Sequence, residues 1–280
     1  GMVIAMLVGS AVYDPALVNR LTAGIGLTLQ LDQDTTLRFP IYLNLATALG
    51  VLVVSLRLQE PAKPRGTTIP TTREAFTSVA NAGRWIARSP LALFVIVGGL
   101  LIDNVIRVFL TFGSAYYRLV DLPEASYGLI GAALAGIGIL ISPVARKLVT
   151  SGSVLHSYGA LSAVALFGLL GVALKIPLWG VVFTLPLGAA IATVGLAVSH
   201  YLNQIVDSRH RATVLSFKGL AFNLGYGFAS LLFALALRAY REPGQPSDGF
   251  GEALRLLPVW FMFTVLVTGV LFWRQRKVLG

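Results

Sequence analysis

The chain has 280 residues, of which 56% are hydrophobic and only 12% are charged, and its mean hydropathy is +0.77. A soluble domain commonly devotes about a quarter of its residues to charge, so this composition excludes an ordinary water-soluble globule. The net charge of +10 does not indicate nucleic-acid binding, because the basic residues lie in short gaps between apolar runs and no basic run carries interleaved aromatic side chains.

Eight apolar runs predict an all-α, polytopic membrane protein. They cover residues 2–13, 40–56, 90–117, 127–144, 154–174, 178–201, 213–239 and 257–273. A helix needs about 20 residues to cross a hydrocarbon core about 30 Å thick, and the first run is too short for that. Because a free amino terminus in mid-membrane would be costly, we expect the chain to begin partway through a span, with preceding helices missing.

The segment 58–89 is predicted to be a linker that ends in a helix. Its first part, QEPAKPRGTTIP, is rich in proline and should not be helical. Thr71 and Glu74 then have the spacing of a capping box, and apolar residues recur at helical spacing while Arg84 and Arg88 fall on the other side. We expect a basic amphipathic helix along the inner membrane surface, acting either as an orienting linker or as a gating element.

Basic residues alternate in density from one connection to the next, which predicts the orientation by the positive-inside rule. The connections that are rich in basic residues are predicted to be cytoplasmic, and they include the 58–89 segment and the carboxyl terminus. We expect the membrane to be a bacterial inner membrane. Their basic residues are Arg57, Lys63, Arg65, Arg73, Arg84, Arg88, Arg146, Lys147, Arg209, Arg211, Lys218, Arg274, Arg276 and Lys277.

The third run carries polar side chains near its middle. Asp103, Asn104 and Arg107 interrupt an otherwise apolar span, and each such group costs roughly 2.5–3.5 kcal/mol to insert at a helix centre. Asp103 and Arg107 are four residues apart and share one helix face, with the acid placed first as the favourable orientation requires. These residues are candidates for the wall of a solute pathway, and the alternative is a self-neutralising pair.

Further candidates lie on the sixth and seventh runs. His200 could carry a proton in the physiological range, although a hydrogen-bonded or interfacial histidine is the commoner case, and Asn203 lies one turn further on. Asn223 and Tyr226 lie deeper in the next run, where hydrogen bonding between helices explains an asparagine equally well.

No enzyme chemistry is indicated. The chain has no cysteine, its three histidines are scattered without ligand spacing, and no group of serine, histidine and acidic residues has the spacing of a catalytic site. We therefore expect no enzyme activity, no metal site and no cofactor.

Three segments together resemble the major facilitator superfamily of transporters. They are SLRLQEP followed by the basic linker, ISPVARKLVTSGS, and HYLNQIVDSRHRATVLSFKGLAFNLGYGFASLL, which is similar to that superfamily's connection between helices ten and eleven. The resemblance covers nearly the whole chain and about two-thirds of a twelve-helix transporter. It implies that residues 1–57 end the first bundle with part of helix five and helix six, that 58–89 link the bundles, and that 90–280 form the second six-helix bundle.

The resemblance implies a secondary transporter that moves a small solute by alternating access, with proton coupling as one option. Its partners would be the lipid bilayer, the solute and the missing amino-terminal helices. The alternative is a polytopic membrane protein that transports nothing, such as a receptor-like protein or an assembly factor.

Overall fold

The computed structural model describes residues 2–27, 30–58, 71–241 and 249–273, and all regular elements within these ranges are helical. The chain forms two compact units. One consists of Gly1–Thr71 with Pro123–Ala135, and the other of Thr72–Leu122 with Gly136–Gly280. The candidate site described below lies within the second unit.

Two short helices of the first unit begin after an aspartate that caps them, Asp14 and Asp32. The Asp14 carboxylate accepts a hydrogen bond from the amide of Ala16 at 2.9 Å, and Pro15 occupies the first position of the second helix. The elements are α1 (Met2–Tyr13), α2 (Pro15–Gly24), α3 (Gln33–Thr36), α4 (Phe39–Arg57) and the 3₁₀ helix η1 (Glu124–Ser126). No residue of α4 is buried, and its side chains are exposed from Ile41 to Arg57.

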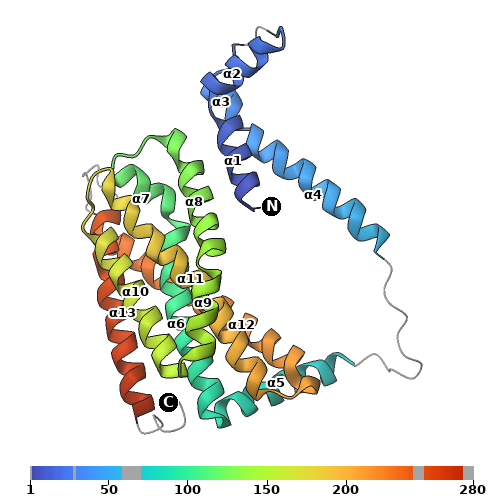
Figure 1. The fold of residues 1–280 in the computed structure, drawn as a ribbon, viewed down its shortest axis with the longest axis vertical. Coiled ribbons are helices and arrows are strands. Elements are labelled where there is room, and N and C mark those ends of the chain that lie inside the picture. The colour runs from blue at the N-terminus through green and yellow to red at the C-terminus, as the bar shows by residue number, and fades with distance from the viewer. Residues whose placement is uncertain (1, 28–29, 59–70, 242–248, 274–280) are drawn as a thin grey trace. The chain divides into compact units, whose positions relative to one another are not determined.

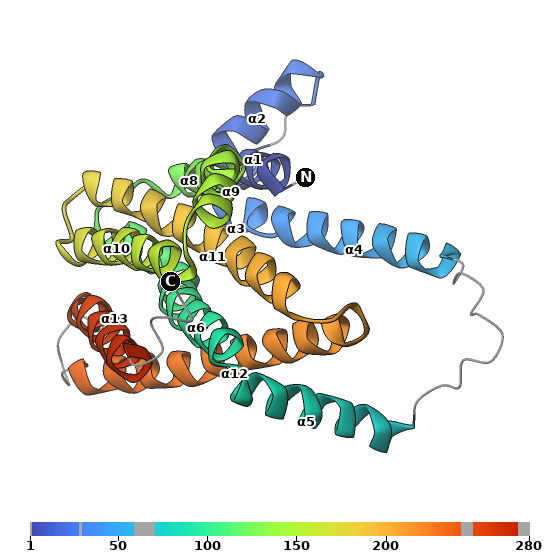
Figure 2. The same ribbon diagram turned by 60° about the horizontal axis from the view of Figure 1, so that its bottom comes forward.

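The second unit is a helical bundle with α6 at its centre (Figures 1 and 2). Helices α10, α11, α12 and α13 all pack against α6. The elements are α5 (Thr72–Arg88), α6 (Pro90–Thr111), α7 (Gly113–Leu119), α9 (Ser142–Ser151), α10 (Val154–Ala173), η2 (Trp179–Phe183), α11 (Thr184–Ile205), α12 (Ser208–Tyr240) and α13 (Phe250–Phe272). Helix α8 (Tyr127–Leu140) begins in the first unit and ends in the second.

Helix α6 holds its central position through two small residues. A side chain at Gly98 would collide with the ring of Tyr158, and one at Gly99 would collide with Val198. The hydroxyl of Tyr158 also donates a hydrogen bond of 2.8 Å to the carbonyl of Val95. Small residues allow helix backbones to approach closely in a membrane, so α10 and α11 can pack directly on α6.

The predicted apolar runs correspond to helices. Within the described residues, six helices are long and apolar enough to cross a membrane, and a seventh span results if the bent pair α8 and α9 is one crossing. That pair bends by 42° at a break before Pro143. The first run forms the short helix α1.

Several boundaries differ from the prediction, among them those of α11 (Thr184–Ile205) and α12 (Ser208–Tyr240). The third run breaks at Phe112 and continues as α7, and the last helix begins at Phe250 rather than at residue 257. The first turns of α13 contain Glu252 and Arg255, which form a 3.0 Å ion pair and lowered the local hydropathy enough to hide the start of the helix.

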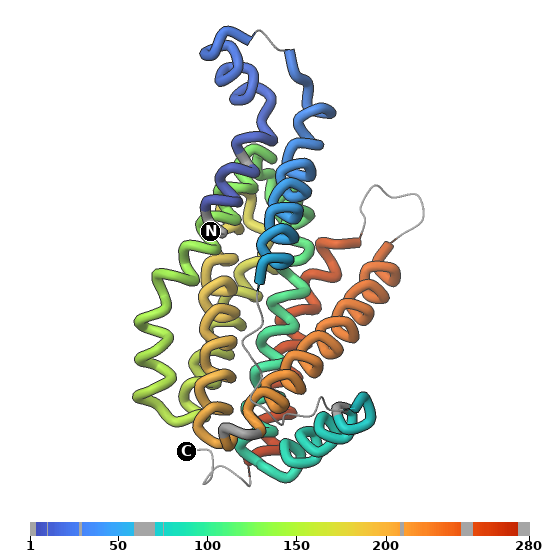
Figure 3. The backbone as a smooth tube through the Cα atoms, turned by 90° about the vertical axis from the view of Figure 1, so that its right-hand side faces the viewer, coloured from blue at the N-terminus to red at the C-terminus, as the bar shows by residue number. Residues whose placement is uncertain are grey.

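The predicted amphipathic helix is present as α5, which begins immediately after Thr71. Its buried side chains are Ala82 and Ile86, and it packs on α6 and on the first part of α12 (Figure 3). Gly83 lies against the ring of Phe217, where an added Cβ would be 3.0 Å from the nearest ring carbon. The preceding residues 59–70 of the predicted linker lie outside the described residues.

Candidate functional site

The candidate site lies where α6 packs on α12. Helix α6 begins at Pro90, after Ser89 has accepted a hydrogen bond from the amide of Ala92 at 3.4 Å. Asp103, Arg107 and Thr111 follow at intervals of four residues and therefore form one polar stripe along the helix.

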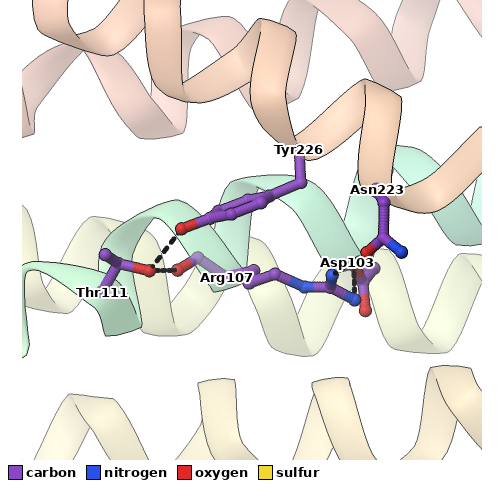
Figure 4. A network of polar contacts seen from close by, with 5 residues as sticks. All are labelled: Asp103, Arg107, Thr111, Asn223 and Tyr226. Atoms are coloured by element: carbon purple, nitrogen blue, oxygen red, sulfur yellow. Dashed lines mark hydrogen bonds and ion pairs between the residues drawn. The ribbon is translucent and has the colours of Figure 1, made fainter.

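Arg107 is the centre of a network that joins the two helices (Figure 4). Its guanidinium lies 2.6 Å from a carboxylate oxygen of Asp103, in an ion pair rather than a well-aligned hydrogen bond. The other terminal nitrogen donates to the side-chain oxygen of Asn223 at 3.3 Å. The same guanidinium lies 5.4 Å from the centre of the Tyr226 ring, within the range of a cation–π interaction.

The network continues from Tyr226 to the end of the stripe. The Thr111 hydroxyl donates to the backbone carbonyl of Arg107 at 2.8 Å and lies 2.8 Å from the Tyr226 hydroxyl. Because the Thr111 proton is already used, we assign Tyr226 as the donor in this second contact. Two side chains of α12, Asn223 and Tyr226, thus contact Arg107.

Burial differs between the two charged groups. The side chain of Asp103 is 9% exposed, whereas that of Arg107 is 33% exposed. The carboxylate is therefore the more buried group of the pair, and the guanidinium is the more accessible one. A guanidinium has five donors in a planar fork and binds carboxylate or phosphate oxygens well, so the site can accept a hydrogen-bond acceptor on a solute.

The structure brings four of the predicted candidates together, namely Asp103, Arg107, Asn223 and Tyr226, and adds Thr111. The spacing of Thr111, four residues after Arg107, was the available signal for it. Asn104 makes no hydrogen bond to this network and instead lines a separate cavity.

The candidates on α11 are His200 and Asn203, and they contact residues outside the network. A ring nitrogen of His200 is 3.0 Å from the amide nitrogen of Gln204, and its ring packs edge-on against Tyr201. The backbone carbonyl of Asn203 accepts a hydrogen bond from Arg211 at 3.2 Å, which ties α11 to the start of α12. The contacts of His200 are those expected of a hydrogen-bonded histidine at a helix end. Within the described residues, no group of three or more metal-ligating side chains is present.

Within the described residues six helices are long and apolar enough to cross a membrane, and five of them belong to the unit that contains the polar network, which indicates a multi-pass membrane protein. No protein-family model matches the chain, and no curated protein matches it. A similar solved structure is that of a bacterial homolog to the human lysosomal transporter Spinster, in an inward-facing and unoccupied conformation. The two chains are 19% identical with a TM-score of 0.61, and the similarity covers 99% of this chain and 68% of that chain. The chain therefore has the fold of that solved structure, and the all-α fold that the sequence predicted is confirmed.

Proposed function

We propose that the protein acts in the transport of a small solute by alternating access, and that the Asp103–Arg107 network contacts the solute or its coupling ion. The observation that carries the proposal is an ion pair between the buried Asp103 and the half-buried Arg107 in the second half of the most enclosed apolar helix, tied by Asn223 and Tyr226 to a second helix. Ionisable groups in a span are costly and commonly mark a pathway. The similarity to a transporter fold supports this function over that of a receptor-like protein or an assembly factor, and no enzyme activity is proposed.

The network also fits the mechanism. In such transporters two bundles rock about a site near the membrane midplane, and the network lies within one of the two proposed bundles, residues 90–280. The Arg107–Asn223 hydrogen bond and the Arg107–Tyr226 contact join α6 to α12, whereas the Asp103–Arg107 pair lies within α6. A solute acceptor group could therefore replace the contacts to α12 while Arg107 stays neutralised.

Water access to the network tests this proposal. The chain has no cysteine, so a single cysteine at Thr111, whose side chain is exposed, reports on one position. A transporter pathway predicts that Thr111→Cys reacts with a membrane-impermeant maleimide in proteoliposomes. Val108→Cys, on the fully buried side of the same helix, should stay unreactive. Equal protection of both cysteines would indicate a network closed to water and would favour the protein that transports nothing.

We further propose that the protein lies in a bacterial inner membrane with α5 and the carboxyl terminus in the cytoplasm, and that residues 1–57, 58–89 and 90–280 are its functional parts. The distribution of basic residues supports this orientation. In intact cells, Ser78→Cys on α5 should resist the impermeant maleimide, and Arg118→Cys at the end of α7 should react. Both positions are exposed. Labelling of Ser78→Cys and not of Arg118→Cys would contradict this orientation and would place α5 outside the cell.

A further inference from the structure

A cavity of about 220 Å³ lies between α6, α12 and α13 in the second unit. Its walls are apolar and aromatic apart from Asn104 and Thr264, and it contains no charged side chain. The proton of the Thr264 hydroxyl is already used, because it donates to the carbonyl of Phe261 in its own helix at 2.9 Å. Asn104 is the cavity-lining side chain that has a buried polar atom without a hydrogen-bond partner.

Asn104 has no partner that explains its burial. The residue is 3% exposed, and its side-chain oxygen has no hydrogen-bond partner. A buried amide without a hydrogen bond destabilises the folded protein, and an apolar residue of similar shape would avoid that loss. The side chain is thus not accounted for by packing alone.

The opposite wall leaves space for this amide. Gly225 of α12 faces Asn104, and a Cβ added there would collide with the amide nitrogen and lie 3.1 Å from two side-chain carbons of Leu100. Glycine at this position therefore keeps the amide and the adjoining space free of side-chain atoms from α12.

The outer wall indicates the direction from which a ligand arrives. Phe228 and Leu232 line the cavity and are 63% and 41% exposed, and the neighbouring Val259 and Phe263 of α13 are also exposed and apolar. An exposed apolar surface on membrane-crossing helices is suited to contact with the hydrocarbon of the bilayer. A ligand that enters here must be soluble in the bilayer and uncharged.

We propose that this cavity binds a neutral, ring-sized apolar molecule with one hydroxyl group, which enters from the bilayer and donates a hydrogen bond to the side-chain oxygen of Asn104. An apolar cavity of about 150 Å³ can hold benzene, so 220 Å³ accommodates a single ring with a small substituent. This site is separate from the Asp103–Arg107 network and does not depend on its role in transport.

Two probes that differ in one hydroxyl test the proposal. 4-Fluorophenol and fluorobenzene are titrated by ¹⁹F NMR into the full chain in lipid nanodiscs, with empty nanodiscs measuring partition into lipid. We expect saturable binding of 4-fluorophenol. Asn104→Leu should weaken it about three- to ten-fold, the worth of one hydrogen bond, and should change fluorobenzene binding by less than about two-fold. Thr264→Val is the matched control on the same wall and should leave both affinities nearly unchanged.

A second variant tests the site without changing Asn104, so the test does not depend on whether Asn104→Leu folds. Leu232→Trp adds volume at the exposed mouth of the cavity and should abolish saturable binding of both probes, with thermal unfolding measured alongside. Absence of saturable binding to the unmodified chain, or equal weakening of both probes by Asn104→Leu, would overturn the proposal. Saturable binding that persists in Leu232→Trp would place the probe elsewhere and would also overturn it.

Discussion

Arg107→Gln will destabilise the protein more than Asp103→Asn, although both changes break the same ion pair. The first leaves a carboxylate that is 9% exposed without its partner, and the second leaves a guanidinium that is 33% exposed. Loss of one partner from a buried pair costs about 3–5 kcal/mol, and we expect Arg107→Gln to fall in this range. Because Arg107 is partly exposed, Asp103→Asn should cost roughly 1–2 kcal/mol.

The double variant distinguishes charge balance between Asp103 and Arg107 from a role of these residues in transport. Asp103→Asn with Arg107→Gln removes both charges, so the free energy of unfolding should recover most of the loss seen in Arg107→Gln. If the network contacts the solute or its coupling ion, transport should stay impaired in the stable double variant, whereas recovery of flux with stability would show that the two charges only balance each other. The surface cluster around Glu252 is the control, since Glu252→Gln breaks exposed pairs to Lys175 and Arg255 and should cost less than about 1 kcal/mol. Equal losses from Arg107→Gln and Glu252→Gln would contradict the burial argument.

Gly168→Leu will prevent α10 from packing on α11. A Cβ at Gly168 would lie 2.6 Å from a methyl carbon of Leu187 and 3.1 Å from the backbone carbonyl of Phe183. Leu187 is fully buried and cannot move aside, and a backbone carbonyl cannot rotate away. Overpacking costs about 1–3 kcal/mol or more, and we expect leucine to reach the upper end of that range or to abolish folding, with Gly168→Ala intermediate.

The matched control is Gly159→Leu on the same helix, where an added Cβ meets no atom within 4 Å. This change should be neutral or stabilise the protein by up to about 1 kcal/mol, because glycine is a poor helix former. Thermal unfolding of the purified variants measures both effects. A similar loss for Gly159→Leu and Gly168→Leu would show that helix propensity, and not packing, determines the result.

Hydropathy predicted the helices well because each span must be apolar over its whole length. The breaks at Phe112 and before Pro143 were not predicted, since a helix bend changes local geometry without changing mean hydropathy. The start of α13 was placed too late for the opposite reason, because Glu252 and Arg255 are polar within a helix.

The candidate site was predictable in part. The Asp103–Arg107 pair is local and follows from helical spacing alone. Its contacts to Asn223 and Tyr226 join residues more than 110 positions apart, so they depend on which helices become neighbours. Asn104 was grouped with Asp103 because the two are adjacent in sequence, but adjacent helical residues point in different directions, and the structure places Asn104 against Gly225.

The central claim is that the network lies on a pathway that opens to each side of the membrane in turn. The direct measurement is the rate at which Thr111→Cys reacts with an impermeant maleimide added to one face, and then to the other, of oriented vesicles. These vesicles hold the product of the longest reading frame that contains this sequence. Alternating access predicts reaction from both faces at rates that shift in opposite directions when a transported solute is added, while Val108→Cys reacts from neither. Reaction from a single face, unchanged by any solute, would contradict the claim.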